Sequence, residues 1–270
     1  MKLKKLRKIY RILFPVKFSE KQIFINELQS NCLIKEFKET NSLFLLNLCN
    51  GKQIYLRDYT HSDYSVFTQI FKDEEYKIAL SFFKYNRDFK NAVMIDVGAN
   101  IGYATIYFQE KLKFDHIICI EPSISNFNIL KKNIELIDNS KDILLLNKAI
   151  ADKENLKFKI ENNFRDGKDW SITTKKSDFG EIQGITLNEI IRENDLKEIT
   201  LLKIDIEGAE RFIFQSSTDL SFLNITKVIV IEIHDEFNVR DSIYKILSDK
   251  QFVLIESGET TIGINKNFLN

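Results

Sequence analysis

The stretch Ala92-Val93-Met94-Ile95-Asp96-Val97-Gly98-Ala99-Asn100-Ile101-Gly102-Tyr103 decides the fold of this chain. Its first residues form a short apolar run of the kind that is buried in the middle of a parallel sheet. A turn with Gly98 and Gly102 follows, and a helical pattern begins at Tyr103, so the free N–H groups of the helix start face the end of the strand. This order predicts a nucleotide-like ligand at the carboxyl end of the strand.

The spacing of the turn differs from that of a dinucleotide site. The dinucleotide motif is G-x-G-x-x-G, whereas here Asp96 precedes Gly98 and no second glycine stands at position 100. A carboxylate at this place suits a hydrogen-bond donor or a cationic ligand better than a pyrophosphate. Glu121 ends the next apolar run, where an acidic side chain can hold a ribose diol. The two acids suit a ligand with a ribose, an amino-acid head and a positive centre, such as S-adenosylmethionine.

Four motifs follow one another between predicted strands. They are Asp96-Val-Gly-Ala-Asn-Ile-Gly-Tyr103, Glu121-Pro-Ser-x-x-Asn126-Phe127-x-x-Leu130-x-x-Asn133, Lys203-Ile-Asp205-Ile-Glu207-Gly-Ala-Glu210 and Ile231-Glu232-Ile233-His234. In this order and spacing the chain resembles the FkbM family of S-adenosylmethionine-dependent methyltransferases, from roughly Leu56 to Val253. The resemblance implies S-adenosylmethionine as cofactor and a hydroxyl of a sugar, a glycan or another small molecule as methyl acceptor.

The remainder of the chain alternates between strand and helix patterns. We predict core strands at 92–96, 116–120, 143–150, 200–204 and 227–233, and helices at 103–112, 124–136, 186–193, 209–216 and 239–247. The alternation indicates an α/β fold with a Rossmann-like, doubly wound, mainly parallel sheet. Residues 156–160 are expected to pair antiparallel outside this order. Residues 252–256 and 261–265 predict a C-terminal antiparallel hairpin, which class I methyltransferases have and nicotinamide enzymes usually lack.

Residues 1–90 predict a small N-terminal extension to a methyltransferase domain of residues 91–270. Strand-like runs between residues 33 and 57, with an Asn-Gly turn signal, predict an antiparallel meander. Two lead-in helices follow, one around residues 66–71 and one over 76–85. The extension thus combines antiparallel strands with helices.

Residues 1–14 carry six Lys and Arg and no acid, interleaved with apolar residues, and predict a short basic amphipathic helix before Pro15. One interpretation is a weak peripheral contact with an anionic membrane surface, near enzymes that build cell-surface polysaccharides. The other is that its apolar face packs on the domain. The low lipid affinity of so short a helix favours this second interpretation.

Composition excludes several other classes of protein. Lys+Arg and Asp+Glu balance at 39 each, so no overall positive field attracts nucleic acid, and we expect no nucleic-acid partner. Three scattered cysteines without a C-x-x-C pair indicate a reducing compartment. Apolar runs stay short of the roughly 18–20 residues that span a bilayer, and no signal peptide is recognisable. We therefore expect a cytoplasmic protein, at most peripheral at the inner membrane face.

The predicted cofactor residues are Asp96, Gly98, Asn100, Gly102 and Glu121. The alternative for the first four is a tight turn that needs small residues, and for Glu121 a helix cap. The adenine pocket is expected at residues 147–152, without a specific side chain.

The predicted catalytic residues are Asp205, Glu207 and His234. The two carboxylates end the fourth strand, where they could orient the acceptor hydroxyl, bind the cofactor's amino group or hold a divalent cation. We assign no metal. His234 ends the fifth strand and can take a proton from a hydroxyl, with Glu232 on the same face to orient it or to help bind the substrate. The alternative is that they are helix-cap or rim residues.

Three rival functions remain open: a nicotinamide-dependent oxidoreductase, a non-catalytic binding module on a methyltransferase fold, and an RNA methyltransferase. The RNA reading requires a basic face, which residues 18–270 do not obviously supply. The polar loop Asp166–Trp170 is expected to form part of a lid over the substrate.

Overall fold

The computed structural model describes residues 18–85, 91–137, 142–161 and 173–269. The chain divides into two compact units, Met1–His61 and Ser62–Asn270. The predicted basic helix at 1–14 and the loop Asp166–Trp170 lie outside the described residues. Among the helices of the described residues, none combines the length and the apolar character that crossing a bilayer requires.

The first unit contains the predicted antiparallel meander. Its strands β1 (Ile34–Thr40), β2 (Leu43–Leu48) and β3 (Gln53–Arg57) pair in that order. The helix α2 (Glu20–Ser30) was not expected from the sequence, and it begins with a capping box between Ser19 and Gln22. Phe24 of α2 is buried, with its ring edge-to-face against Phe44 of β2 at 5.2 Å. This unit therefore has a small apolar core of its own.

The second unit is built on a seven-stranded sheet of order β13-β14-β12-β11-β4-β5-β6. The strands are β4 (Val93–Val97), β5 (His116–Ile120), β6 (Ile143–Leu146), β11 (Ile199–Ile204), β12 (Thr226–Glu232), β13 (Phe252–Ser257) and β14 (Thr260–Asn265). β14 pairs antiparallel with both β12 and β13, and the other pairings from β12 to β6 are parallel. The predicted doubly wound sheet with its C-terminal antiparallel hairpin is confirmed.

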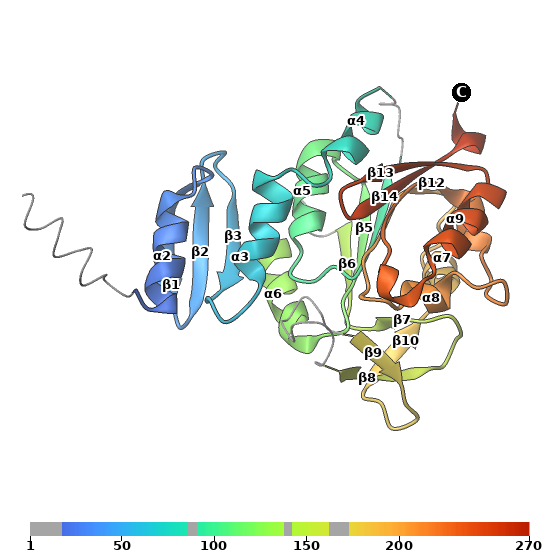
Figure 1. The fold of residues 1–270 in the computed structure, drawn as a ribbon, viewed down its shortest axis with the longest axis horizontal. Coiled ribbons are helices and arrows are strands. Elements are labelled where there is room, and N and C mark those ends of the chain that lie inside the picture. The colour runs from blue at the N-terminus through green and yellow to red at the C-terminus, as the bar shows by residue number, and fades with distance from the viewer. Residues whose placement is uncertain (1–17, 86–90, 138–141, 162–172, 270) are drawn as a thin grey trace, which may run out of the picture. The chain divides into compact units, whose positions relative to one another are not determined.

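Helices cover both faces of this sheet. Figure 1 shows α5 (Tyr103–Leu112) and α6 (Ile124–Ile134) on one side, and α7 (Leu187–Glu193) and α9 (Arg240–Asp249) on the other. The central strands β4 and β11 are consequently buried along their whole length. This double burial explains why they read in the sequence as continuous apolar runs rather than as alternating ones.

The lead-in helices pack on the same unit. α3 (Asp63–Phe67) continues into a π-helix (Thr68–Lys72), and α4 (Lys77–Tyr85) follows. Aromatic rings of this segment pack against rings of α5. The ring centroids of Phe71 and Tyr103 lie 5.7 Å apart, and those of Tyr76 and Phe108 lie 5.0 Å apart. Residues 62–85, which we placed in the extension, thus lie against the main sheet's own helix. The predicted boundary between the N-terminal extension, residues 1–90, and the methyltransferase domain, residues 91–270, stays a prediction.

The predicted third strand, 143–150, is interrupted. β6 ends at Leu146, and the side-chain amide of the next residue, Asn147, donates hydrogen bonds to the carbonyls of Glu121 and Pro122, at 2.9 and 3.0 Å. The chain then enters a second sheet of order β7-β10-β8-β9. These strands are β7 (Ala149–Ile150), β8 (Lys157–Glu161), β9 (Thr173–Lys176) and β10 (Ile182–Ile185). The expected antiparallel pairing of residues 156–160 is present, whereas β9 and β10 were not predicted.

The strand order fixes where a ligand can bind. From β4 the chain builds outward through β5 and β6, and it then returns to β11 and β12 on the other side of β4. In open α/β sheets such a reversal leaves a crevice at the carboxyl ends of the two strands that flank it. The motifs after β4, β5, β11 and β12 all lie at this edge.

Candidate active site

A cavity of about 410 Å³ opens at the carboxyl edge of the main sheet. Its walls come from the turns after β4, β5, β11 and β12, from the segment between Val66 and Tyr76, from Ala149 and Ile150, and from Glu259 in the β13–β14 turn. Small-molecule sites in proteins typically measure about 300–1,000 Å³. The cavity therefore has the size and the position of a cofactor and substrate site.

The turn after β4 is fixed from both neighbouring strands. Gly98 has φ +78°, and a Cβ at this position would collide with the carbonyl oxygen of Asp205 after β11. The N–H groups of Gly98 and Ala99 both donate to the carbonyl of Ile120, at 3.0 Å. Asn100 also has a positive φ, +50°. A glycine is thus required at position 98 for close approach of the strands, and the turn presents backbone to the cavity.

Three predicted cofactor residues, Gly98, Asn100 and Glu121, line the cavity. The carboxylate of Glu121 is oriented by two backbone donors: the N–H of Asn100 at 2.9 Å and the N–H of Ser123 at 2.8 Å. Burial raises the pKa of Glu121 to about 7, although both hydrogen bonds act in the opposite direction. A carboxylate held in this way keeps acceptor capacity for hydroxyl groups that enter the cavity.

Asp96 and Gly102 lie behind this lining. Gly102 lies at the N-cap position of α5 and packs against Leu130 of α6. Asp96 is fully buried, accepts a hydrogen bond from Thr105 Oγ1 at 2.6 Å and pairs with Lys203 at 3.2 Å. Neither residue is among the described residues that line the cavity. Direct contact of these two residues with a cofactor stays a prediction.

Lys203 joins the two halves of the site. Its ammonium lies 3.2 Å from Asp96 and 3.4 Å from Asp205, and it donates to the carbonyl of Gly98 at 2.7 Å. Burial alone would lower the pKa of this ammonium, but the carboxylates of Asp96 and Asp205 raise it above its ordinary value. Lys203 stands opposite Asp96 in the parallel register of β11 and β4. It is therefore charged, and it ties the glycine turn to the end of β11.

His234 is surrounded by carboxylates. Its Nδ1 lies 3.0 Å from Glu210 Oε1, and its Nε2 lies 3.1 Å from Glu207 and 3.6 Å from Glu232. Burial lowers the pKa of the ring, but the hydrogen bonds and charges of Glu207 and Glu210 outweigh it and raise the pKa to about 10. The His234 side chain is buried and is not among the described lining residues, whereas Glu207 and Glu232 are.

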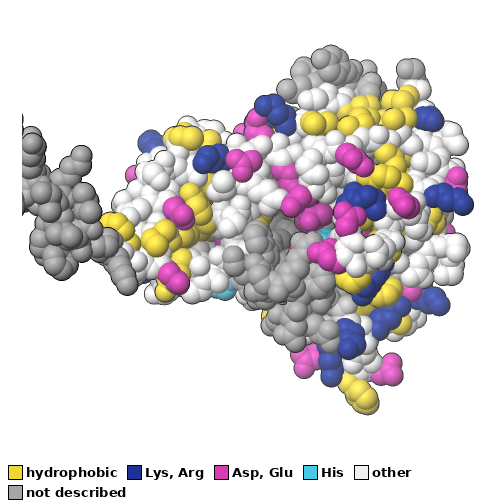
Figure 2. All heavy atoms as spheres, in the orientation of Figure 1, with side chains coloured by type: hydrophobic (Ala, Val, Ile, Leu, Met, Phe, Trp, Pro, Cys, Tyr) yellow, Lys and Arg dark blue, Asp and Glu magenta, His cyan; other side chains and the backbone are white. Residues whose placement is uncertain are grey.

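The lining of the cavity is acidic. Of the described residues that line it, six are acidic and Lys203 alone is basic. Burial and the Asp205 charge raise the pKa of Glu75 to about 7 and that of Glu232 to about 9. Figure 2 shows acidic side chains gathered near the middle of the face that it draws. Such a wall favours neutral or cationic ligands over anionic ones.

Two groups of side chains here could also bind a cation. The ligand atoms of Asp205, Glu207 and His234 lie within 4.8 Å of one another, and those of Glu75, Glu232 and Glu259 do so as well. In the first group, however, both ring nitrogens of His234 face carboxylates, as in a protonated imidazole rather than a metal ligand. The assignment of no metal stays a prediction.

The sequence analysis assigned no role to four residues of this site. Lys203 and Glu210 stand inside the third motif, and only the strand register and the fold show their partners. Glu75 and Glu259 come from a lead-in turn and a hairpin turn, and no local pattern marks them. The loop Asp166–Trp170 lies outside the described residues, so its predicted role as a lid stays a prediction.

Comparison with known proteins assigns the chain to a protein family. The model of the methyltransferase FkbM domain matches residues 96–254, which is more than half of the chain and includes all four motifs. The chain belongs to the FkbM methyltransferase family. The sheet with antiparallel β14 between β12 and β13 is accordingly the class I methyltransferase type predicted from the sequence, and the protein is a methyltransferase rather than an oxidoreductase.

Several named proteins are similar to this methyltransferase. Methyltransferase sdnD from Sordaria araneosa is 25% identical over 221 residues, 69% of this chain and 81% of that protein. The structure of methyltransferase FkbM from Methylobacillus flagellatus KT is 17% identical, with a TM-score of 0.39, and the match covers 65% of this chain and 44% of that one. TrmK from M. capricolum, solved with S-adenosyl-homocysteine, is 15% identical, with a TM-score of 0.38 and coverages of 71% and 69%.

Proposed function

We propose that this methyltransferase transfers the methyl group of S-adenosylmethionine to a hydroxyl group of a sugar, a glycan or another small molecule. The observation that carries the proposal is the position of the Glu121 carboxylate. Two backbone N–H groups hold it at the wall of a cavity that the acidic residues Asp205 and Glu207 also line. Membership of the FkbM family supports methyl transfer itself.

The residues around the turn fit this cofactor. The Glu121 carboxylate can accept hydrogen bonds from the two ribose hydroxyls. The side-chain oxygen of Asn100 is buried at the cavity without a hydrogen-bond partner, so it can accept one from a ligand. Ala149 and Ile150 offer an apolar surface, as an adenine ring requires. When bound, S-adenosylmethionine would supply a methyl group on a sulfonium sulfur, and the sulfur keeps the electron pair of the broken C–S bond as a neutral thioether.

The acidic wall addresses the acceptor. Carboxylates accept hydrogen bonds from hydroxyl groups, so Asp205 and Glu207 can orient an acceptor oxygen and receive its proton. Sugar phosphates and other anionic acceptors would be repelled, because the lining carries an excess of negative charge. A primary amine is the second candidate acceptor, since the same carboxylates would hold an ammonium group.

A panel of acceptors tests the proposal. The protein is incubated with S-adenosylmethionine and, separately, with a neutral glycoside, an amino sugar and a sugar phosphate, and formation of S-adenosylhomocysteine is measured. We expect turnover with the neutral glycoside and none with the phosphate, and mass spectrometry and NMR identify the methylated atom. Methylation of the amine alone would favour the second candidate. Preference for the sugar phosphate would contradict the acidic wall as the acceptor site.

Three further expectations stay predictions: a cytoplasmic site of action, a role in polysaccharide synthesis, and a weak membrane contact of residues 1–14. Vesicle binding of the full chain, compared with a chain that lacks residues 1–14, tests the last of them.

A further inference from the structure

His234 is not among the described residues that line the cavity. Its side chain is fully buried, and the carboxylates of Glu207 and Glu232 lie between its Nε2 atom and the cavity. Each ring nitrogen lies within 3.1 Å of a carboxylate oxygen, of Glu207 or of Glu210, an arrangement that favours a proton on both. A protonated imidazole cannot take a proton from a hydroxyl. His234 must therefore act through a neighbour.

Glu210 holds the ring from behind. It is the first residue of α8 (Glu210–Ile213) and is completely buried. Its Oε1 atom accepts from the backbone N–H of His234 at 2.9 Å and faces Nδ1 at 3.0 Å. One carboxylate oxygen thus fixes both the backbone and the ring of His234, and it stabilises the ring's positive charge.

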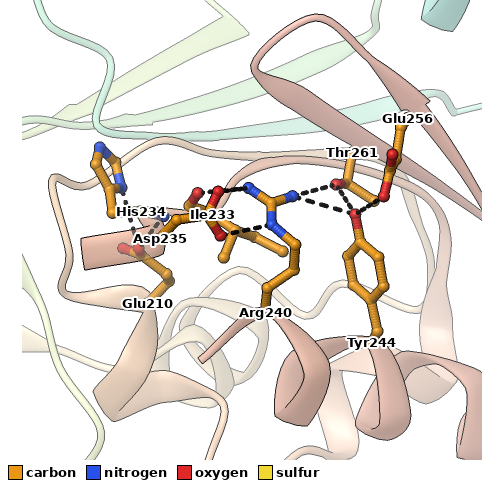
Figure 3. Close-up of polar contacts among 8 residues, drawn as sticks. All are labelled: Glu210, Ile233, His234, Asp235, Arg240, Tyr244, Glu256 and Thr261. Carbon is orange, nitrogen blue, oxygen red and sulfur yellow. Dashed lines mark hydrogen bonds and ion pairs between the residues drawn. The ribbon is translucent and has the colours of Figure 1, made fainter. Parts of the chain in front are cut away.

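The turn that carries His234 is held from the other side as well. Figure 3 shows Arg240 of α9 between this turn and the hairpin: it donates to the carbonyl of Ile233 at 2.9 Å and to Asp235 at 2.6 and 2.9 Å. The same guanidinium donates to Tyr244 at 3.1 Å, and Tyr244 contacts Thr261 of β14 at 2.8 Å. The ring of His234 consequently has little freedom to swing into the cavity.

Glu207 is presented to the cavity by an unusual backbone. Its φ is +47°, a left-handed conformation that residues with a Cβ rarely adopt. Gly208 follows with φ +83°, and a Cβ there would collide with the ring of Phe237. Strain of this kind persists where the surrounding structure imposes it, and it is common at functional sites. Here it aims the carboxylate at His234 and at the cavity.

We propose that Glu207 receives the proton of the acceptor, and that Glu210 and His234 form a positioning pair that holds the Glu207 carboxylate in place. The inference rests on the proposed methyl transfer. As the acceptor oxygen bonds to the methyl carbon, its O–H bond breaks and the proton passes to Glu207. Glu232 is less suited, because burial and its acidic neighbours raise its pKa to about 9, so it carries a proton at neutral pH.

The charged groups around this pair fix the direction of each pH effect. Glu207 faces His234 from the turn before α8, Glu210 from α8 and Glu232 from β12, and the charges of Asp205 and Glu259 act on Glu232. Removing the imidazolium takes away a nearby positive charge that stabilises the Glu207 carboxylate. Removing the charge of Glu210 lowers the pKa of His234.

The first test is independent of turnover. Long-range ¹H–¹⁵N spectra of the three histidine rings are recorded against pH, with His234→Gln used for assignment. We expect both ring nitrogens of His234 to be protonated at pH 7.5. The midpoint should fall by about one unit or more in Glu210→Gln and in Glu207→Gln. A neutral His234 ring at pH 7.5 would overturn the inference whether or not the protein transfers methyl groups.

The second test uses kinetics at saturating acceptor. We expect kcat to fall by about 10²-fold or more in Glu207→Gln, and by about 10-fold or more in His234→Gln and Glu210→Gln. In all three variants the affinity for S-adenosylhomocysteine should stay within about threefold of the wild-type affinity. The acid limb of kcat/KM should move to higher pH in His234→Gln, which a merely structural loss would not cause. The matched controls are Glu193→Gln, an exposed residue of α7, and His116→Gln at the opposite end of β5.

The outcomes separate the two proposals. If His234→Gln does not fold, Glu210→Gln answers the question, because glutamine keeps the size of the side chain and can still accept the backbone N–H. Wild-type turnover with unchanged kcat and pH profile in the positioning variants would overturn the inference and leave the proposed function standing. Activity that requires a divalent cation and is lost with EDTA would also overturn it, since Glu207 and His234 would then be ligands.

Discussion

Replacing Lys203 by methionine tests the electrostatic centre of the site. Methionine keeps an unbranched side chain, one heavy atom shorter, and removes the charge. Asp96 would then remain fully buried without its cation, and Asp205, which is about one-third exposed, would lose the same partner. Removing one member of a buried ion pair typically costs about 3–5 kcal/mol. We expect a loss of this size in the free energy of unfolding.

The expected loss can be measured by denaturant or thermal unfolding. For a chain of this length it corresponds to a decrease in Tm of about 6–20 °C. The double variant Lys203→Met with Asp96→Asn should be less unstable than the two single losses added together, by at least about 1 kcal/mol, because the asparagine leaves no buried charge. Lys197→Met is the control, since the Lys197–Asp195 pair is exposed and worth little.

The pH dependence of this loss has a definite sign. The carboxylates raise the pKa of Lys203 above its ordinary value of 10.5, so its contribution is complete below that value and is lost as the pH rises through the folded-state pKa. The contribution of the Lys203 charge itself should therefore not be lost between pH 6 and 9, and Glu121 and Glu75, whose pKa values Lys203 lowers, should add a change near neutral pH. A cost below about 1 kcal/mol, or additive effects in the double variant, would refute the assignment of Lys203 as the partner of Asp96.

Three shorter predictions follow from the same geometry. Gly98→Ala should abolish binding of S-adenosylhomocysteine in a calorimetric titration, because its Cβ meets the neighbouring backbone, whereas Gly51→Ala, with a similar φ and open space, should not. Because burial raises the pKa of Glu121 to about 7, affinity for the same ligand should rise from pH 6 to 8, and this rise should vanish in Glu121→Gln. Arg240→Met should lower kcat by about tenfold through the turn after β12, while exposed Lys245→Met on the same helix should leave the rate unchanged.

The centre of the sheet could be predicted because β4 and β11 are buried on both faces and therefore appear as largely apolar runs. Contacts between residues that are distant in the sequence could not be predicted from local patterns. At the break after β6, the side chain of Asn147 bonds to the backbone of Glu121 and Pro122, about 25 residues away in the sequence. Helix α2 was missed because Phe24 and Leu28 are its only buried residues, too few for a clear helical pattern.

The site was predictable in its backbone and less so in its side chains. Gly98 and Glu121 follow apolar strands directly, and both line the cavity as expected. The partner of Asp96 is Lys203, and their pairing follows from the register of two strands more than 100 residues apart. The burial of His234 behind Glu207 likewise depends on packing that no local pattern records.

The most direct test of this account is a calorimetric titration with S-adenosylhomocysteine, with NAD as the comparison ligand. We predict micromolar binding of S-adenosylhomocysteine and no comparable binding of NAD. Loss of a hydrogen bond to a charged group costs about 1.5–3 kcal/mol, so Glu121→Gln should weaken binding at least tenfold. Glu193→Gln, on the exposed face of α7, should bind like wild type. Tight binding of NAD, or S-adenosylhomocysteine affinity that Glu121→Gln leaves unchanged, would contradict the assignment of this cavity as the cofactor site.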